Sequence, residues 1–254
     1  MADLELIVLG SASGLPEPDR AHASLALHRG EDVWLLDAGE GVCSSLLRCS
    51  LEPESVRSIY ITHCHPDHCV GIFMLLQYLH MKGFRQKIDI HLPAGAIGAF
   101  QTFMIQLYLV PGVFYPPYHL EPLDAEHQLD DYISLYTLPT KHLKRWEELE
   151  LPGLETRSYA FRIKSPSGSI FYSGDVSGMA DIEGYLHPGE LLILEASHVD
   201  FDSVLSAAQT VGIERILLTH ALPEQRHSLA DLQFRAAKFG VEIMLARDGL
   251  RLSL

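Results

Sequence analysis

Residues 62–69 read THCHPDHC and directly follow the apolar run SIYI at residues 58–61. Three histidines and one aspartate, His63, His65, Asp67 and His68, lie within the six positions 63–68. Neutral imidazole and carboxylate are the ligands that zinc and related divalent ions prefer. The stretch therefore indicates a metal site at the end of a strand. The alternative interpretation is a solvent-exposed histidine-rich turn.

The spacing within this stretch suits two metal ions. Alternate side chains of an extended segment point the same way, so His63 and His65 can converge on one ion. Pro66 favours an extended conformation at His65 and is well suited to the first position of a helix. Asp67 and His68 then fall on the first helical turn, displaced toward a second ion.

Three later residues of ligand type each lie directly beyond a strand-like run. They are His142 after residues 131–138, Asp175 after residues 168–173, and His220 after residues 215–218. Layered α/β folds place their active-site loops at the ends of strands. Each residue alone also fits an ordinary loop histidine or turn aspartate, but four strand ends agree on one kind of chemistry.

The stretch at 62–69 resembles the HxHxDH signature of the metallo-β-lactamase superfamily. The resemblance implies an α/β fold, a four-layer αββα sandwich of two mixed sheets flanked by helices, with residues 1–254 as one domain. It also implies two divalent metal ions, zinc, or manganese or iron with the same donors. The implied ligands are His63, His65 and His142 for one ion, Asp67, His68 and His220 for the other, and Asp175 as a bridge.

Four other segments are similar to ribonuclease Z and its cyclic phosphodiesterase relatives. They are LGSASGLP at 9–16, DAGEG at 37–41, SYAFRI at 158–163, and LEAS at 194–197, where Leu194 replaces the leading histidine of the HEAT segment. His198 precedes His220 by 22 positions, the spacing of a non-ligand histidine that assists phosphate-ester cleavage in this branch. The resemblance implies a catalytic His198 oriented by Glu195. A structural or surface histidine is the alternative, because the loop around His198 differs from that of ribonuclease Z.

The implied reaction is hydrolysis of a phosphodiester by a hydroxide that bridges the two metal ions. Asp67 would also accept a proton from this water, and His198 would protonate the leaving alkoxide. One alternative is a ribonuclease Z that processes the 3′ ends of tRNA. The others are a lactone, thioester or carboxylic-ester hydrolase with the same metals, and a binding protein with a vestigial site.

The charge of the chain favours a small phosphodiester substrate over nucleic acid. The formal net charge is −14, from 19 Lys and Arg against 33 Asp and Glu. Proteins that bind polyanions usually neutralise phosphates with basic side chains. No Gly/Pro-rich basic arm of the kind with which ribonuclease Z grips tRNA is evident between His68 and His142. Lys141, Lys144 and Arg145 form one candidate basic patch beside His142.

The remaining sequence predicts the layout of the chain. The expected strands lie near 4–9, 24–28, 33–37, 58–61, 87–91, 131–138, 156–164, 168–173, 191–195, 215–218, 241–245 and 250–252, and the expected helices near 42–49, 70–79, 94–109, 202–212 and 224–239. Residues 112–122 are expected to form a loop. The apolar and aromatic residues of 100–118 favour core packing or a homodimer face over a lid above the substrate.

Composition indicates a cytoplasmic protein without a membrane segment. No apolar run is long enough to span a bilayer, and the first residues lack the basic region of a signal peptide. The four cysteines, Cys43, Cys49, Cys64 and Cys69, are few and are expected to be reduced. Cys64 should point away from the face of the metal-binding histidines, which favours packing over metal ligation.

Overall fold

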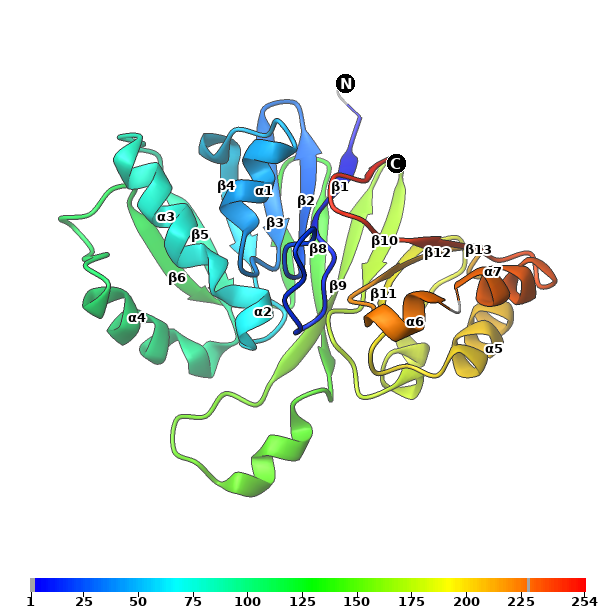
Figure 1. The fold of residues 1–254 in the computed structure, drawn as a ribbon. Helices are drawn as coiled ribbons and strands as arrows, with labels where there is room; N and C mark the ends of the chain where they lie inside the picture. The colour runs from blue at the N-terminus through cyan, green and yellow to red at the C-terminus, as the bar shows by residue number, and fades with distance from the viewer. Residues whose placement is uncertain (1–2, 228) are drawn as a thin grey trace. The chain divides into compact units, whose positions relative to one another are not determined.

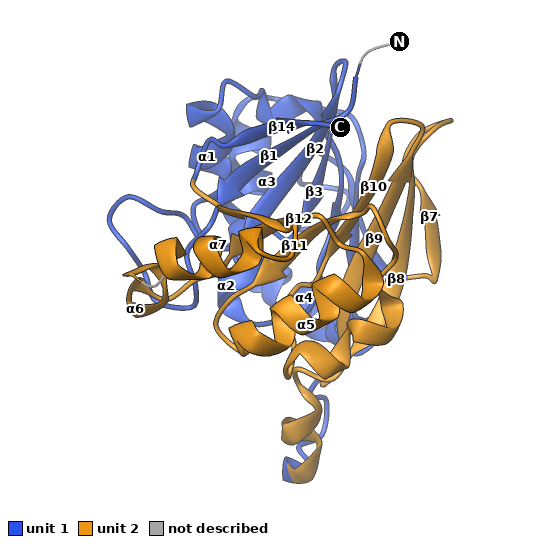
Figure 2. Cartoon of the chain, turned by 90° about the vertical axis from the view of Figure 1, so that its right-hand side faces the viewer, with its two compact units in different colours: residues 1–123, 149–155, 248–254 blue, residues 124–148, 156–247 orange. Residues whose placement is uncertain are grey.

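The structure is a computed structural model that describes residues 3–227 and 229–254 (Figure 1). The chain divides into two compact units, shown in two colours in Figure 2. The first unit comprises residues 1–123, 149–155 and 248–254, and the second comprises residues 124–148 and 156–247. Each unit has its own sheet and its own apolar core. The single domain expected from the sequence stays a prediction.

The first unit is built on a mixed seven-stranded sheet. In order across the sheet, its strands are β14 (Arg251–Ser253), β1 (Glu5–Gly10), β2 (Ser24–Arg29), β3 (Asp32–Leu36), β4 (Val56–Tyr60), β5 (Ile88–Leu92) and β6 (Tyr118–Pro122). The pairs from β14 to β3 are antiparallel, and the pairs from β3 to β6 are parallel. The buried apolar run Val33–Leu36 of β3 fits a strand that is covered by packed side chains.

Helices cover one face of this sheet. They are α1 (Val42–Arg48), α2 (Pro66–Cys69), α3 (Gly71–Met81) and α4 (Ile97–Gln106), with short 3₁₀ turns at Pro53–Ser55 and Ala94–Ala96. Figure 1 shows α3 and α4 beside β5 and β6. Helix α3 buries Ile72, Leu75, Leu76 and Leu79, the spacing of one helical face, in the core of the first unit. This packing fixes the start of α3, which directly follows the histidine-rich stretch.

The second unit repeats the sheet pattern of the first. Its strands, in order across the sheet, are β13 (Glu242–Leu245), β12 (Arg215–Thr219), β11 (Leu191–Glu195), β10 (Gly168–Tyr172), β9 (Ser158–Ser165), β8 (Ser134–Thr140) and β7 (Glu126–Gln128). The pairs from β7 to β10 are antiparallel, and the pairs from β10 to β13 are parallel. The carboxyl ends of β10, β11 and β12 therefore lie at one edge of this sheet.

Helices α5 (Phe201–Val211), α6 (Pro223–His227) and α7 (Leu229–Ala237) belong to the second unit, with 3₁₀ helices η3 (Lys144–Leu149), η4 (Met179–Asp181) and η5 (Glu183–Tyr185). Helix α5 begins at an Asp200 cap, whose side chain accepts a hydrogen bond from the Ser203 amide. It ends at Gly212, which has a φ of 87° and so closes the helix in the left-handed conformation. Among the described residues, no helix has the length and apolar character of a membrane span.

The two mixed sheets with their helices confirm the predicted fold class, and two details differ from the prediction. Residues 118–122, expected as part of a loop, form β6, an edge strand at which the terminal Pro122 is tolerated. Residues 126–128 form the unpredicted short strand β7. The helix expected at 224–239 is found as α6 and α7, and residue 228 between them lies outside the described residues.

The apolar segment 100–118 of the first unit has both buried and exposed side chains. Its members Met104, Leu109, Phe114 and Tyr118 are buried in the core of that unit. Phe103, Ile105, Tyr108 and Val113 are exposed. The predicted core role is thus correct for part of the segment, and the homodimer face stays a prediction for the rest.

Candidate functional site

The first unit holds His63 and His65 in the loop between β4 and α2. His65 is extended, with φ −64° and ψ 145°, and Pro66 is the first residue of α2, as predicted. His63 Nε2 lies 3.0 Å from His65 Nδ1. Two nitrogen ligands of one tetrahedral zinc ion lie about 3.4 Å apart when each Zn–N bond is about 2.1 Å. These two nitrogen atoms are therefore placed to share one ion.

A buried aspartate orients the next ligand of the first unit. His68 Nδ1 lies 2.8 Å from Asp37 Oδ2, and both side chains are buried. The amide and the hydroxyl of Thr62 donate to Asp37 Oδ1 at 2.7 and 2.9 Å. A carboxylate that holds one ring nitrogen fixes the ring, so that the other nitrogen can serve as the ligand. Asp37 thus presents His68 Nε2, which lies 3.7 Å from Asp67 Oδ2.

Asp37 contacts a predicted metal ligand, a position that the sequence did not predict. It lies just past β3 with a φ of 58°, a left-handed conformation that few non-glycine residues adopt. Gly39, two positions on, has no space for a side chain, because a Cβ there would come within 2.2 Å of the Asp67 carbonyl oxygen. The DxGxG turn therefore packs against the backbone of the metal loop. The sequence feature that could have indicated this role is the aspartate that opens the DAGEG turn at residues 37–41.

The opening loop of the chain is anchored by a residue near its other end. Asp248 Oδ1 accepts hydrogen bonds from the Ser11 amide at 3.0 Å and the Ser11 hydroxyl at 2.8 Å. Asp248 Oδ2 accepts from the Ala21 amide at 2.7 Å. The loop so anchored brings Gly14 against Asp67, since a Cβ on Gly14 would be 3.4 Å from Asp67 Oδ2. Asp248 therefore holds the loop that borders a predicted metal ligand.

Replacing Asp248 with alanine is expected to lower the free energy of unfolding by about 2 kcal/mol, because three donors to a carboxylate lose their acceptor. Chemical denaturation followed by circular dichroism would measure the change. Asp3→Ala, which removes an exposed carboxylate of the same unit, is the control and should leave stability nearly unchanged. Equal stability of both variants would show that the Asp248 hydrogen bonds contribute nothing.

The cysteines beside the metal loop have the character of packed thiols. Burial raises the pKa of Cys64 to about 12, and it raises the pKa of Cys69 as well. Cys69 Sγ lies 3.3 Å from the His65 carbonyl oxygen, to which the thiol can donate. Among the described residues the four cysteines form no disulfide.

In the second unit a buried aspartate lies between two histidines. Asp175 directly follows the end of β10, and its Oδ2 lies 3.6 Å from His142 Nε2. Its other oxygen, Oδ1, lies 3.8 Å from His220 Nδ1. All three side chains are buried. Each carboxylate oxygen thus faces a different imidazole, the arrangement expected of a carboxylate that bridges two ions.

Each of these histidines also contacts a second partner in its own unit. His142 Nδ1 lies 3.4 Å from the Val176 carbonyl oxygen, an interaction that directs Nε2 toward Asp175. His220 Nδ1 lies 3.1 Å from the Ser197 hydroxyl, and His220 has a φ of 55°. Strained or fixed conformations of this kind are common where a side chain is preorganised for function.

His198 is oriented by Glu195, as the sequence predicts. His198 Nδ1 lies 3.1 Å from Glu195 Oε1, and the His198 amide donates to Glu195 Oε2 at 3.0 Å. This hydrogen bond raises the pKa of His198 above its ordinary value, although partial burial acts in the opposite direction. The His198 ring lies edge-on to His142, with 5.0 Å between ring centroids. The pair thus places a partly exposed imidazole beside a predicted metal ligand.

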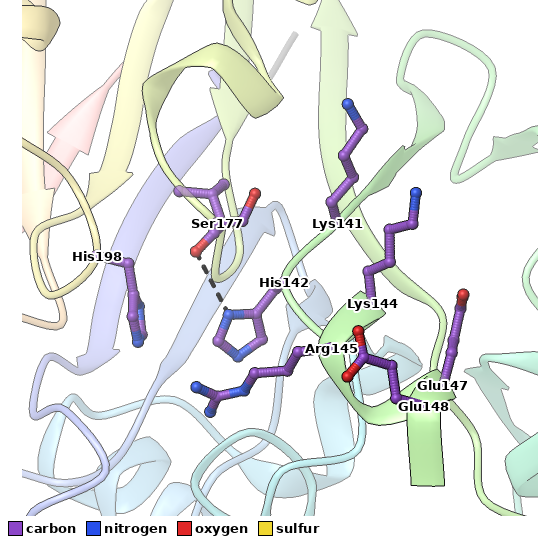
Figure 3. A pocket seen from close by; sticks show the side chains of 9 residues that line it. Lys141, His142, Lys144, Arg145, Glu147, Glu148, Ser177 and His198 are labelled. Carbon is purple, nitrogen blue, oxygen red and sulfur yellow. Dashed lines mark hydrogen bonds between the residues drawn. The ribbon is translucent and has the colours of Figure 1, made fainter. Parts of the chain in front are cut away.

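A pocket of about 610 Å³ adjoins these two histidines in the second unit (Figure 3). Its walls come from the loop after β8, from η3, and from the loops after β10 and β11. The charged side chains that line it are Lys141, Lys144, Arg145, Glu147 and Glu148. The candidate basic patch of the sequence analysis therefore lines the pocket that contains His142 and His198.

Comparison with known proteins identifies the family. A family model described as a β-lactamase superfamily domain matches residues 26–221. The chain belongs to the β-lactamase superfamily. The resemblance inferred from HxHxDH is thereby confirmed.

One curated relative of this superfamily is the protein named ribonuclease Z from Acaryochloris marina. It is 31% identical over 175 residues, which are 66% of this chain and 55% of the relative. The chain thus spans about half the length of that relative.

Two solved structures of the superfamily share the fold. The metallo-β-lactamase fold protein YhfI from Bacillus subtilis aligns over the full length of both chains, with a TM-score of 0.77 and 20% identity. The short form of human tRNase Z aligns over 98% of each chain, with a TM-score of 0.74 and 22% identity. At these identities the likeness shows the metallo-β-lactamase fold.

Proposed function

We propose that this chain is a metal-dependent hydrolase with two divalent ions, and that its substrate is a small phosphodiester. The proposed ligands are His63, His65, Asp67 and His68 of the first unit and His142, Asp175 and His220 of the second. All are imidazole or carboxylate donors, which suit zinc best and are compatible with manganese or iron. The ions would supply an activated water and offset charge on the phosphate.

The observation that carries the two-ion proposal is the position of Asp175. Its two oxygens face His142 and His220 at 3.6 and 3.8 Å, and the three side chains are buried. Buried carboxylates and imidazoles are usually paired or bound to a metal, because isolated burial is costly. A carboxylate with one oxygen toward each of two ligand histidines supports a shared, bridging role.

The chain's own acid would be His198. Its Nδ1 is engaged by Glu195, which leaves Nε2 to donate a proton to the leaving oxygen of the substrate. Glu195 is buried and fixed, and it also accepts a hydrogen bond from the Val176 amide at 3.4 Å. This dyad supports general acid catalysis on an ester with a poor leaving group. We propose that Asp67, in addition to binding metal, accepts a proton from the attacking water.

Charge supports a small substrate. The formal net charge of −14 produces a field that disfavours long polyanions, which gain affinity by neutralising many phosphates. The pocket beside His198 is of the size that small ligands occupy, since such pockets measure ~300–1,000 Å³.

A ribonuclease Z activity is the second candidate, and the name of the relative at 31% identity is the observation that favours it. The two candidates differ in the substrate they need. A ribonuclease Z must bind precursor tRNA, whereas a small-diester hydrolase needs no nucleic-acid surface.

The proposal predicts turnover of bis(p-nitrophenyl) phosphate and no binding of precursor tRNA. Zinc- or manganese-loaded protein should hydrolyse the chromogenic diester, and precursor tRNA should give no gel shift even at low salt, where electrostatic binding is strongest. Chelator-treated protein is the control for hydrolysis. Cleavage of precursor tRNA at its 3′ end, without turnover of the small diester, would replace this proposal with the ribonuclease.

The cytoplasmic location and the homodimer that the sequence suggests stay predictions. Size-exclusion chromatography with light scattering would measure the oligomeric state, and the exposed members of segment 100–118 are the proposed contact surface.

A further inference from the structure

Three basic side chains line the pocket of the second unit. Lys141, Lys144 and Arg145 all line it and are exposed. In the part of the chain that the structure describes, none of the three side chains forms an ion pair with a carboxylate. Arg145 contacts the Trp146 ring instead, with its guanidinium carbon 5.1 Å from the ring centroid. Unpaired cations at one pocket of a chain with net charge −14 indicate that the pocket binds an anion.

Arg145 is the cation directed toward the candidate catalytic histidine. Figure 3 shows its side chain extending toward His142 and His198, whereas Glu147 and Glu148 lie on the opposite side of the pocket. Arg145 is the second residue of η3 and lies three positions after His142. The positive charge of Arg145 also acts on His198, where it lowers the pKa against the larger effect of Glu195.

The chemistry of the Arg145 side chain suits a phosphate group. A guanidinium presents a planar fork of N–H donors that matches two phosphate oxygens, and it stays charged at every physiological pH. The pocket volume of about 610 Å³ exceeds what one phosphate group fills. The pocket therefore has room for a substrate group in addition to the scissile diester.

We propose that this pocket binds a second phosphate group of the substrate, anchored by Arg145 and assisted by Lys144. The substrate class is then a nucleotide-sized phosphodiester that also carries a phosphate monoester. The inference rests on the proposed function, because it places the scissile diester on the side of His198. Glu147 and Glu148 also line the pocket, and their negative charges disfavour additional phosphates beside the proposed subsite.

Two chromogenic diesters test this subsite. They are thymidine 5′-(p-nitrophenyl phosphate) with and without a 3′-phosphate, assayed at low salt with metal-loaded protein. The 3′-phosphate should raise kcat/KM by about 10-fold or more, as one charge-assisted hydrogen-bonded group does. Arg145→Gln should remove this preference, so that the ratio of the two kcat/KM values falls to about one. Equal kcat/KM for the two diesters with the wild-type protein would overturn the inference.

The matched control is the double variant Lys164→Gln/Arg215→Gln, which removes two exposed cations of the same unit that do not line the pocket. It should keep the full preference, and Lys144→Gln/Arg145→Gln should lose it. A loss of preference in the control as well would mean that net charge, and not this pocket, recognises the phosphate, which also overturns the inference.

Failure of the proposed function can be separated from failure of the subsite. If neither diester is hydrolysed, pyrophosphate is titrated into chelator-treated protein by calorimetry. Binding that Arg145→Gln abolishes and the control retains would support an anion subsite in a protein with another activity. No binding of pyrophosphate to the wild-type protein, or equal binding to Arg145→Gln, would overturn it.

Discussion

Replacing Asp175 with alanine is expected to abolish turnover and to reduce bound metal from two ions per chain to one or none. The carboxylate is buried and has His142 and His220 within 3.8 Å, so its loss removes a donor from both proposed ions. Loss of an outer-shell partner alone costs ~10–100-fold in metal affinity or activity, and loss of a direct ligand should cost more. Elemental analysis after dialysis and the rate of bis(p-nitrophenyl) phosphate hydrolysis are the two measurements.

Asp131→Ala is the matched control, because it removes an exposed carboxylate of the same unit. It should bind two ions and retain full turnover. Asp67→Ala tests the first unit in the same way and should also abolish turnover. If Asp175→Ala or Asp67→Ala kept both ions and the wild-type rate, the two-ion scheme would be wrong.

Replacing His198 with alanine is expected to leave metal content unchanged and to lower kcat by ~10²–10⁴, the usual contribution of a general acid. The ring is held by Glu195 at 3.1 Å and lies 5.0 Å from the ring of His142. The His198 ring therefore lies close to a proposed metal ligand but is not itself a proposed ligand. Elemental analysis and steady-state kinetics on the same preparation would separate an effect on chemistry from an effect on metal binding.

Two further variants accompany the His198 experiment. Glu195→Gln keeps the shape of the side chain but removes its charge, so it should give a smaller loss of kcat than His198→Ala. His187→Ala removes an exposed histidine of the same unit and should have no effect on rate. A wild-type kcat in His198→Ala would assign His198 to the surface and leave the acid unidentified.

The sequence predicts the local geometry of the metal loop well, because that geometry depends on near neighbours. Pro66 sets both the extended backbone of His65 and the start of α2, and alternation brings His63 and His65 together. The Glu195–His198 pair is likewise local, because the partners are three positions apart. Family resemblance supplied the fold class and the order of the ligands.

What the sequence did not predict depends on contacts between distant residues. Asp37 orients His68 from 31 positions away, and Asp248 anchors Ser11 across 237 positions. No periodicity or spacing rule connects such pairs. Strand β6 was not predicted for a related reason. Its pairing with β5 outweighs the turn character of Pro122 and of the prolines that precede the strand.

We propose that two ions per chain support hydrolysis of a phosphodiester. A metal titration measures directly how the rate of hydrolysis depends on the number of bound ions. Chelator-treated protein is titrated with zinc, and in parallel with manganese, while bis(p-nitrophenyl) phosphate hydrolysis is followed. We expect no turnover without metal and a rate that saturates at two equivalents per chain. A rate that is independent of added metal, or that saturates at one equivalent, would contradict it.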